Sequence, residues 1–462
     1  MTSIKYALYA LNQEYGTAIG TDKTARFNAT NTLVIAGSVS NGGAAVLHAA
    51  EQDTEGLIDG VVANEPSAQP SSTSGYGVTS GATAVPVYGK PLVDVFTVAN
   101  IYQPCAALAA SVTMAEASVF NYMSLQTLLG NDMNTRGANR CTALATRGLI
   151  TGTTTAERAD AALQKLRDYG YTAENDTMHN HLFGLGNSPI IAMMYTNAFG
   201  RFSMIDNLCG MSAAQVNAAT GDVVPVSAVT KAVSFAAANG TLNGVPASVV
   251  YNNSVGGAKS WMFAVSPTSG TADFALDAAL CQRSLITGMD ATGTSALTAS
   301  TTPTLAQSQA VQAGMAQALL SGNLHGKPTL IVAGHSDGLV PLNHSERAYT
   351  AFNKSVEGAA SQLSYIEVFN GQHFDTFLTF SGFDNRYIPL HPYYNRAMDA
   401  MYAKLKNGTA LPGSQVVRAT ARGGSPGAAP AITAANVPNF VTAPAAADTI
   451  SIGAGNVIAI PN

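Results

Sequence analysis

Apolar positions along the first part of the chain follow two different repeats. Over residues 4–14 they recur at helical spacing, which predicts an amphipathic helix. Short apolar runs rich in β-branched residues, at 31–36 and 57–63, predict two strands, and the stretch 43–52 between them has a helical pattern. The order of strand, sharp turn, helix and strand is typical of a parallel α/β sheet.

The pattern changes over residues 67–322. Loops rich in Gly, Ser and Thr alternate there with helical stretches such as 107–129 and 156–168. We interpret this region as a large insertion, made mostly of helices and loops, that forms a lid over the sheet.

Strand patterns resume at 327–333 and 363–369, and a helical stretch follows over 389–406. After Gly408 the chain is rich in Ala, Pro and Gly and has little periodicity, which indicates a loosely structured or edge-packing tail. The chain is therefore expected to divide into a first part of the sheet core at 1–66, a lid at 67–322, a second part of the core at 323–407 and a tail at 408–462.

Composition and charge narrow the class of protein. With 462 residues, 47% of them hydrophobic, the chain can bury a large core and fill two or three domains. It contains no uninterrupted apolar run of about 18 residues, so we predict no membrane span. The formal net charge is −5 and no cluster of Lys or Arg occurs, so we expect no nucleic-acid partner.

Only 11% of the residues are charged, against a usual share of about 25%, and this bias suits an exported bacterial protein. The residues after Met1 lack the basic and apolar regions of a signal peptide. Either the protein is not exported or this chain lacks its natural beginning, and of the two we expect a secreted or periplasmic protein whose export leader is not part of this chain. Four cysteines, Cys105, Cys141, Cys209 and Cys281, share no metal-type spacing, and either disulfides or buried thiols fit them.

Residues 36–43 place a serine in the setting that a nucleophilic serine needs. Ser40 stands between a short apolar strand and a helix, with the small residues Ser38 and Gly42 two positions to either side. Small residues there allow the sharp strand-to-helix turn that exposes the serine hydroxyl. A glycine-rich turn with incidental serines is the alternative, and we interpret Ser40 as the nucleophile.

A second turn, at residues 334–338, matches the pattern G-x-S-x-G letter for letter and offers Ser336 as a competing nucleophile. Hydrolases with this elbow run Ser, acid, His along the chain, with sheet strands in between. Only one strand pattern lies between Ser336 and His373. We therefore interpret this turn as the carrier of the acid, Asp337, which follows a buried strand. A plain turn or helix-capping role for Asp337 is the alternative.

His373 lies on a loop just past the strand predicted at 363–369. A histidine in that place can accept the proton of the serine, while an acid holds its ring in the required tautomer. A surface histidine without a role is the ordinary alternative, but the chain order Ser40, Asp337, His373 favours a triad. Asp375 is the reserve candidate for the acid.

The remaining histidines fit other roles. His179 and His181 form a pair without a third ligand at a suitable spacing, so we predict no metal site and no cofactor. His48 falls in a predicted helix and is interpreted as structural. His391, close to two prolines, could contact the lid.

The stretch LVIAGSVSNGGA at residues 33–44, with its continuation to residue 66, resembles the D-(-)-3-hydroxybutyrate oligomer hydrolases of bacteria, which carry a similar SVSNGG elbow. The resemblance extends through the middle region to residues 335–341 and 372–374. It implies an α/β-hydrolase fold. It also implies a serine esterase that hydrolyses dimers and short oligomers of 3-hydroxybutyrate, the products of polyhydroxybutyrate breakdown.

Carried over to this sequence, the resemblance makes Ser40 the nucleophile and places Asp337 and His373 at the positions of the acid and the base. The backbone N–H of Asn41 would be one oxyanion donor. Family members have further strands ahead of the elbow, which we expect to be missing from this chain together with the second oxyanion donor.

Two other functions stay open at this point. A tannase-like or feruloyl-type esterase would need an aromatic pocket, and a single Trp in the sequence argues against it. A hydrolase-like binding protein without activity would keep the scaffold but lose the chemistry.

Overall fold

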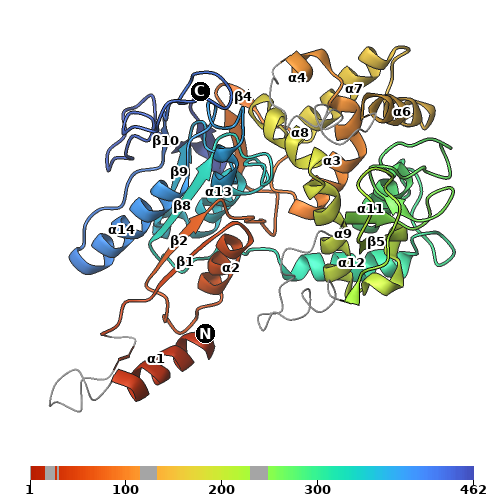
Figure 1. The fold of residues 1–462 in the computed structure, drawn as a ribbon. Coiled ribbons are helices and arrows are strands. Elements are labelled where there is room, and N and C mark those ends of the chain that lie inside the picture. Colours follow the sequence, from red (N-terminus) through yellow and green to blue (C-terminus); the bar gives the residue numbers. More distant parts are fainter. Residues whose placement is uncertain (1, 16–26, 29–30, 115–132, 229–247) are drawn as a thin grey trace. The chain divides into compact units, whose positions relative to one another are not determined.

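Two compact units make up the protein in a computed structural model (Figure 1). The first unit combines Met1–Lys90 with Leu319–Asn462, and the second unit is Pro91–Ala318. The structure describes residues 2–15, 27–28, 31–114, 133–228 and 248–462.

A five-stranded parallel sheet forms the centre of the first unit. Its strands follow the order β1-β2-β8-β9-β10, and every neighbouring pair is parallel. The strands are Ile35–Val39 (β1), Gly60–Asn64 (β2), Thr329–Gly334 (β8), Leu363–Val368 (β9) and Gln415–Val417 (β10). Because parallel strands end on the same side, the residues that follow β1, β2, β8 and β9 meet along one edge of the sheet.

Helices cover both faces of this sheet, as Figure 1 shows. These helices are α2 (Ser40–Glu51), α13 (Glu346–Glu357) and α14 (His391–Asn407). Side chains alternate along each strand, so Val61 and Ala63 of β2 pack with α2 and α13, whereas Val62 packs with α14. Burial on both faces explains why these strands are continuous apolar runs in the sequence.

The strands expected from the sequence of the first unit are present with shifted bounds. β1 and β2 begin four and three residues later than the runs at 31–36 and 57–63 suggested. The helix expected at 4–14 is α1 (Thr2–Tyr15), and the helix expected at 389–406 is α14. Strand and helix types were therefore predicted better than their ends.

A second sheet in the first unit joins distant parts of the chain. Its order is β11-β12-β3-β4, formed by Gly77–Ser80 (β3), Thr83–Ala84 (β4), Ser451–Ile452 (β11) and Val457–Ile460 (β12). Residues 67–90, expected in the lid, are thus part of the first unit. The tail after residue 408 provides β10 at one edge of the central sheet. It also provides β11 and β12 of this second sheet.

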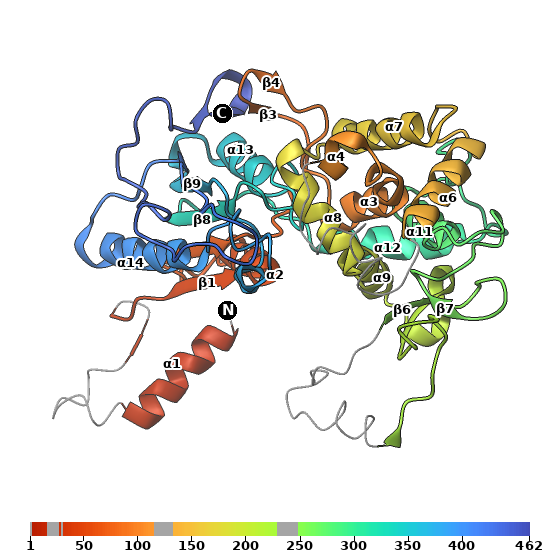
Figure 2. The ribbon, with the colours of Figure 1, turned by 45° about the horizontal axis from the view of Figure 1, so that its top comes forward.

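The second unit is mostly helical. Its helices are α3 (Leu92–Ala106), α4 (Ala110–Met114), α6 (Met133–Thr146), α7 (Thr155–Asp168), α8 (Asp176–Gly184), α9 (Asn187–Gly200), α11 (Leu276–Thr287) and α12 (Leu305–Gln317). A three-stranded antiparallel sheet accompanies them, formed by Met211–Ala214 (β5), Ser248–Tyr251 (β6) and Lys259–Ser260 (β7). Helix α3 packs against α6, α7, α9 and α11 (Figure 2).

Two disulfides lie in the second unit. Cys105 at the end of α3 is bonded to Cys141 in α6, and Cys209 is bonded to Cys281 in α11. The structure thus selects disulfides over the buried thiols that the sequence left as an alternative. Each bond links segments far apart in sequence and restricts the unfolded chain.

Helix α3 differs from the expectation for this unit. The sequence suggested a helix at 107–129, of which α4 is the described part, because residues 115–132 lie outside the described residues. Nearly every side chain of α3 is buried, so no polar stripe marks it in the sequence. Within the part of the chain that the structure describes, no helix is both long and apolar enough to cross a membrane.

Candidate active site

Ser40 occupies a sharp turn between β1 and α2. β1 ends at Val39, and α2 begins at Ser40 itself, whose φ angle is +54°. A non-glycine residue with positive φ is strained, at a cost of about 1–3 kcal/mol, and such strain concentrates at functional sites. The turn therefore has the geometry of a nucleophile elbow.

The glycines after Ser40 are required by close contacts. A Cβ atom on Gly42 would lie 2.2 Å from the Oγ atom of Ser38, and one on Gly43 would lie 3.0 Å from the Cβ of Pro66. This is the physical reason for small residues two positions before and after the serine. It also accounts for the second glycine, because α2 passes close to the end of β2.

Asp337 lies on the turn after β8 and is fully buried. Its Oδ1 atom accepts hydrogen bonds from the backbone N–H groups of Leu339 and Val340, at 2.8 and 2.9 Å. These bonds hold the carboxylate in place and leave Oδ2 to face His373. The buried strand and the turn residues after it thus aim one oxygen at the histidine.

His373 connects the acid to the serine. Its Nδ1 atom lies 2.7 Å from Oδ2 of Asp337, and its Nε2 atom lies 2.9 Å from Oγ of Ser40. In the neutral tautomer with the proton on Nδ1, the ring donates to Asp337 and accepts from the Ser40 hydroxyl. The three residues predicted from chain order therefore form one continuous hydrogen-bonded chain.

Glycines let the two loops that carry the acid and the histidine approach each other. A Cβ on Gly334 would lie 2.5 Å from the carbonyl carbon of Gly371 and 2.7 Å from the backbone N of Gln372. In the same place, the N–H of Ser336 donates to the carbonyl of Gly371 at 2.9 Å. The glycine at 334 is thus a packing requirement of the His373 loop.

The surroundings make His373 a strong base. Burial lowers the pKa of His373. The carboxyl groups of Asp337 and Glu65 raise this pKa by more than burial lowers it, so the pKa is about 9 in place of 6.5. The ring is thereby biased towards holding a proton. The same carboxyl groups stabilise the imidazolium that forms when this ring accepts the proton of a serine.

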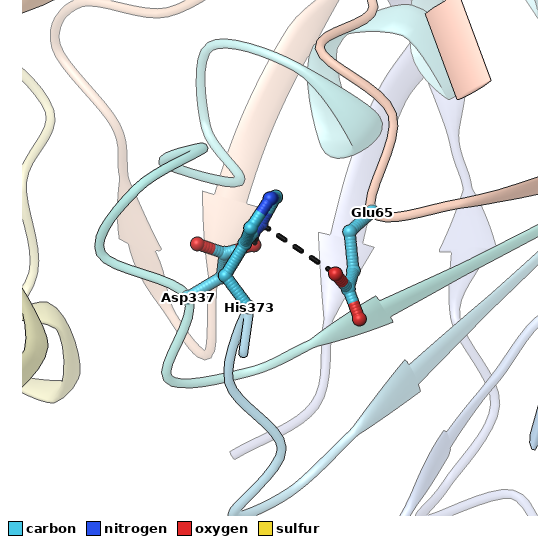
Figure 3. Close-up of side chains that lie close together, drawn as sticks. All are labelled: Glu65, Asp337 and His373. Atoms are coloured by element: carbon cyan, nitrogen blue, oxygen red, sulfur yellow. Dashed lines mark hydrogen bonds and ion pairs between the residues drawn. The ribbon is translucent and has the colours of Figure 1, made fainter. Parts of the chain in front are cut away.

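Glu65 is a member of this group that the sequence reasoning missed. It follows β2 directly, is buried, and places Oε2 3.6 Å from Nδ1 of His373 (Figure 3). Burial raises the pKa of Glu65 to about 8, an effect that His373 opposes and that Asp337 and Asp375 strengthen. A carboxyl residue on the turn after a buried strand was the signal that selected Asp337, and it would have selected Glu65 as well.

The other candidate side chains have different surroundings. Asp375, the reserve acid, accepts hydrogen bonds from the N–H groups of Leu390 and His391 at the start of α14. The ring of His48 in α2 contacts the side chain of Gln52, the residue that follows this helix, at 2.6 Å. These contacts give both side chains structural roles, and neither is part of the hydrogen-bonded chain through His373.

The histidine pair of the second unit is divided. His179 is buried and stacks on Tyr171 with ring centroids 4.4 Å apart, and burial lowers the pKa of His179 to about 3. The side chain of His181 lies outside the described residues. His391 lies in the first unit, with its ring 6.2 Å from that of Tyr394.

Among the described residues, the cluster whose atoms are arranged as a possible set of metal ligands is Glu65, Asp337 and His373, all within 4.8 Å of one another. Here Nδ1 of His373 already bonds to Asp337, and Nε2 bonds to Ser40. Because both ring nitrogens are engaged in a Ser–His–acid chain, we interpret the cluster as the acid side of a triad.

Helix α2 supplies a donor for negative charge. Its first N–H groups have no acceptor within the helix, and the N–H of Asn41 is the first after the serine. The positive end of the helix dipole adds to the attraction. If a carbonyl carbon became bonded to Oγ of Ser40, its oxyanion would therefore accept a hydrogen bond from the N–H of Asn41.

Comparison with known proteins places the chain in a family. The model of the 3HB-oligomer hydrolase (3HBOH) family matches residues 1–462. Proteins named D-(-)-3-hydroxybutyrate oligomer hydrolase are 44% identical in Paracidovorax citrulli (strain AAC00-1), covering all of this chain and 63% of the relative, and 43% identical in Ralstonia pickettii, covering all of this chain and 60% of the relative.

The chain thus spans less than two thirds of the length of these curated relatives. No solved structure matches the chain. The match to the family model over the whole chain and the identities above 40% show that the chain belongs to the 3HB-oligomer hydrolase family.

Proposed function

We propose that this protein is a serine esterase that hydrolyses dimers and short oligomers of 3-hydroxybutyrate. The observation that carries the proposal is the hydrogen-bonded chain from Ser40 through His373 to Asp337. The names of the relatives supply the substrate class. A parallel sheet with helices on both faces and an elbow after one strand supports an α/β-hydrolase fold for the first unit.

In the first half of the reaction, Oγ of Ser40 attacks the ester carbonyl carbon while its proton moves to Nε2 of His373. Asp337 stabilises the imidazolium that forms. The oxyanion of the tetrahedral intermediate accepts a hydrogen bond from the N–H of Asn41. When the carbon–oxygen bond of the ester breaks, His373 gives its proton to the departing hydroxyl, and a 3-hydroxybutyryl ester of Ser40 remains.

In the second half, water attacks this acyl-enzyme and gives a proton to His373. The second tetrahedral intermediate breaks its bond to Oγ of Ser40, and His373 returns the proton to that oxygen. The products are a free 3-hydroxybutyrate carboxyl group and the original serine. No external oxidant or reductant is required.

Product analysis tests the substrate assignment. The protein is incubated with 3-hydroxybutyrate dimer, trimer and solid polymer, and with a galloyl or feruloyl ester as a control. Release of 3-hydroxybutyrate from the dimer, with little erosion of the solid, is expected. Rapid erosion of the polymer, or a preference for the aromatic ester, would refute the assignment. A folded protein that neither turns over an ester nor takes up a fluorophosphonate probe would be a binding protein.

We also propose that the protein acts in an oxidising compartment, either secreted or periplasmic. The disulfides Cys105–Cys141 and Cys209–Cys281 support this, because such bonds persist outside the reducing cytosol. Mass spectrometry of protein taken from native cells, with free thiols blocked at lysis, should find both pairs oxidised in an extracellular or periplasmic fraction. Reduced cysteines in a cytosolic fraction would contradict the location.

A further inference from the structure

Glu65 stands beside the same ring nitrogen of His373 that Asp337 contacts. Its Oε2 atom lies 3.6 Å from Nδ1, and the Asp337 Oδ2 atom lies 2.7 Å from it (Figure 3). The mechanism above uses Asp337 and leaves Glu65 without a task. Two carboxyl groups around one imidazole nitrogen are one more than a triad needs.

The conformation of Glu65 is unfavourable in two respects. Its φ angle of +47° lies in the left-handed region, where a non-glycine residue is strained. The residue is only 5% exposed, and burial of a carboxyl group is costly unless the group is neutral or paired. A surface or glycine residue at this turn would avoid both costs, so the position of Glu65 calls for a functional explanation.

The remaining contacts orient the side chain towards the histidine. The backbone N–H of Glu65 donates to the carbonyl of Val332 at 2.7 Å, which fixes the turn to the neighbouring strand β8. The side-chain amide of Asn64 donates to Oε1 at 3.0 Å. With Oε1 occupied, Oε2 is left to face the imidazole.

Several titratable groups surround Glu65. His373, Asp337 and Asp375 act on it electrostatically, and Glu65 in turn acts on the buried carboxyl group of Glu346. Burial raises the pKa of Glu65 to about 8, while the His373 ring opposes the rise. Glu65 is therefore mostly protonated at neutral pH and becomes a carboxylate in mildly alkaline solution.

We propose that Glu65 is a second positioning residue for His373: it shares Nδ1 with Asp337 and takes over the support of the ring when Asp337 cannot provide it. This inference rests on the proposed esterase function. A movement of about 0.6 Å would bring Oε2 from 3.6 Å to the ~3.0 Å of an N–H···O hydrogen bond. At neutral pH the protonated Glu65 leaves Asp337 as the charged partner.

The test compares four forms of the full-length protein: native, Asp337→Asn, Glu65→Gln and the double variant. Loss of a triad acid with its geometry intact reduces kcat by roughly 10⁴-fold. We expect Asp337→Asn alone to lose only about 10²- to 10³-fold, with a residual rate that increases as Glu65 ionises above neutral pH. The double variant should lose the full ~10⁴-fold and this alkaline increase.

The pH dependence of kcat/KM in Glu65→Gln separates a positioning role from a merely structural one, because a structural role would leave this pH dependence unchanged. In the mildly alkaline range where His373 titrates, Glu65 is a carboxylate that helps to hold the proton on His373, so its removal lowers the pKa of His373. The acid limb of the kcat/KM profile should therefore shift to lower pH, while kcat at the alkaline plateau falls less than tenfold.

Glu346→Gln is the matched control. Glu346 is also a buried glutamate, and its carboxyl group lies close enough to Asp337 to interact with it electrostatically. Burial raises the pKa of Glu346 well above its ordinary value, so the substitution changes no charge near neutral pH. It should leave the acid limb in place.

The proposal is overturned if Asp337→Asn and the double variant have equal rates at every pH, or if Glu65→Gln and Glu346→Gln have the same profile as the native protein. Circular dichroism and thermal unfolding establish that each variant is folded. A native protein that neither reacts with the probe nor turns over the dimer would instead contradict the esterase function itself, so the two failures are distinguishable.

Discussion

Two turns of the first unit carry a serine between small residues, and only one of them has the geometry of a nucleophile. The first turn, at residues 38–42, joins the end of β1 to α2, and the second, at 334–338, begins at the last residue of β8. Both strands belong to the same parallel sheet and end on the same side. The second turn matches the G-x-S-x-G pattern in full, whereas the first has Ser38 in place of the first glycine.

The two turns differ in their backbone conformation and in the element after the serine. Ser40 has a φ angle of +54° and starts a twelve-residue helix, so its Oγ reaches His373 at 2.9 Å. In the second turn, the N–H of Ser336 is bonded to Gly371, and the next residue, Asp337, is the one whose side chain reaches His373. The glycines of the second turn serve the approach of two loops.

The G-x-S-x-G pattern therefore finds small residues on either side of a serine, but it does not show which structural constraint requires them. At the first turn the small residues make room for a strained strand-to-helix junction, and at the second they make room for the backbone of the histidine loop. Chain order separated the two turns where the letters did not: three strands of the central sheet lie between Ser40 and His373, but only one lies between Ser336 and His373.

The largest expected effect comes from exchanging the two serines for alanine. Ser40→Ala should abolish labelling by a fluorophosphonate probe and reduce kcat on the 3-hydroxybutyrate dimer by roughly 10⁴- to 10⁶-fold, since it removes the attacking oxygen. Ser336→Ala should keep the labelling and lose only a few-fold in kcat. Mass spectrometry of the labelled peptide identifies which serine carries the probe.

Both serine variants are compared at equal folded fraction by circular dichroism. Labelling that persisted in Ser40→Ala and vanished in Ser336→Ala would reverse the comparison, and with it the assignment of the nucleophile.

The second prediction concerns the glycine of the other turn. Gly334→Ala would place a methyl group 2.5 Å from the carbonyl carbon of Gly371, and both partners are backbone. The loops that carry Asp337 and His373 must then separate. A displacement of about 1 Å at a catalytic group can cost ~10²-fold, which is the fall in kcat that we expect. Steady-state kinetics and thermal unfolding measure the two consequences.

Ser336→Ala serves as the control in the same turn, because it shortens a side chain and leaves the backbone alone. Native-like kinetics in Gly334→Ala would mean that the two loops can move apart without harm to the triad.

A third prediction follows from the pKa of His373. The ring must be neutral to accept the proton of Ser40, and its pKa is raised to about 9 by Asp337 and Glu65 against the effect of burial. The value of kcat/KM should therefore rise with pH through the range well above 6.5, about tenfold per unit below the pKa. A profile measured between pH 5 and 10 that is already flat at pH 7 would contradict this.

The sequence predicted the central sheet because its strands are long apolar runs. Each of the runs near 31–36, 57–63, 327–333 and 363–369 became a strand. Strands of two to four residues, such as β10 and β12 in the tail, are too short for a periodic pattern to be visible. Helix α3 was missed because a helix buried on every side has no polar face.

The triad was predicted better than its surroundings. Ser40, Asp337 and His373 were chosen by their places after strands and by chain order, and the structure joins them by hydrogen bonds. Glu65 was overlooked because a glutamate before a proline resembles an ordinary turn. Its relation to His373 depends on the pairing of β2 with β8, which brings together residues far apart in the chain.

The smallest expected effect concerns Ser38, which stands where the G-x-S-x-G pattern has its first glycine. Ser38→Gly restores the full pattern around Ser40 and should change kcat less than about threefold, with a loss of stability of about 0.5–1 kcal/mol because glycine is flexible in a strand.

Gly42→Ala alone places a Cβ 2.2 Å from the Oγ of Ser38 and 3.1 Å from its Cβ, and should impair both folding and turnover. In the double variant both of these Ser38 atoms are absent, so the new methyl group at position 42 fits. The double variant should therefore be more stable and more active than Gly42→Ala, with a coupling of about 0.5–3 kcal/mol from thermal unfolding. Strictly additive effects would mean that the size of residue 38 does not set the need for glycine at 42, and that the two small positions of the elbow act independently.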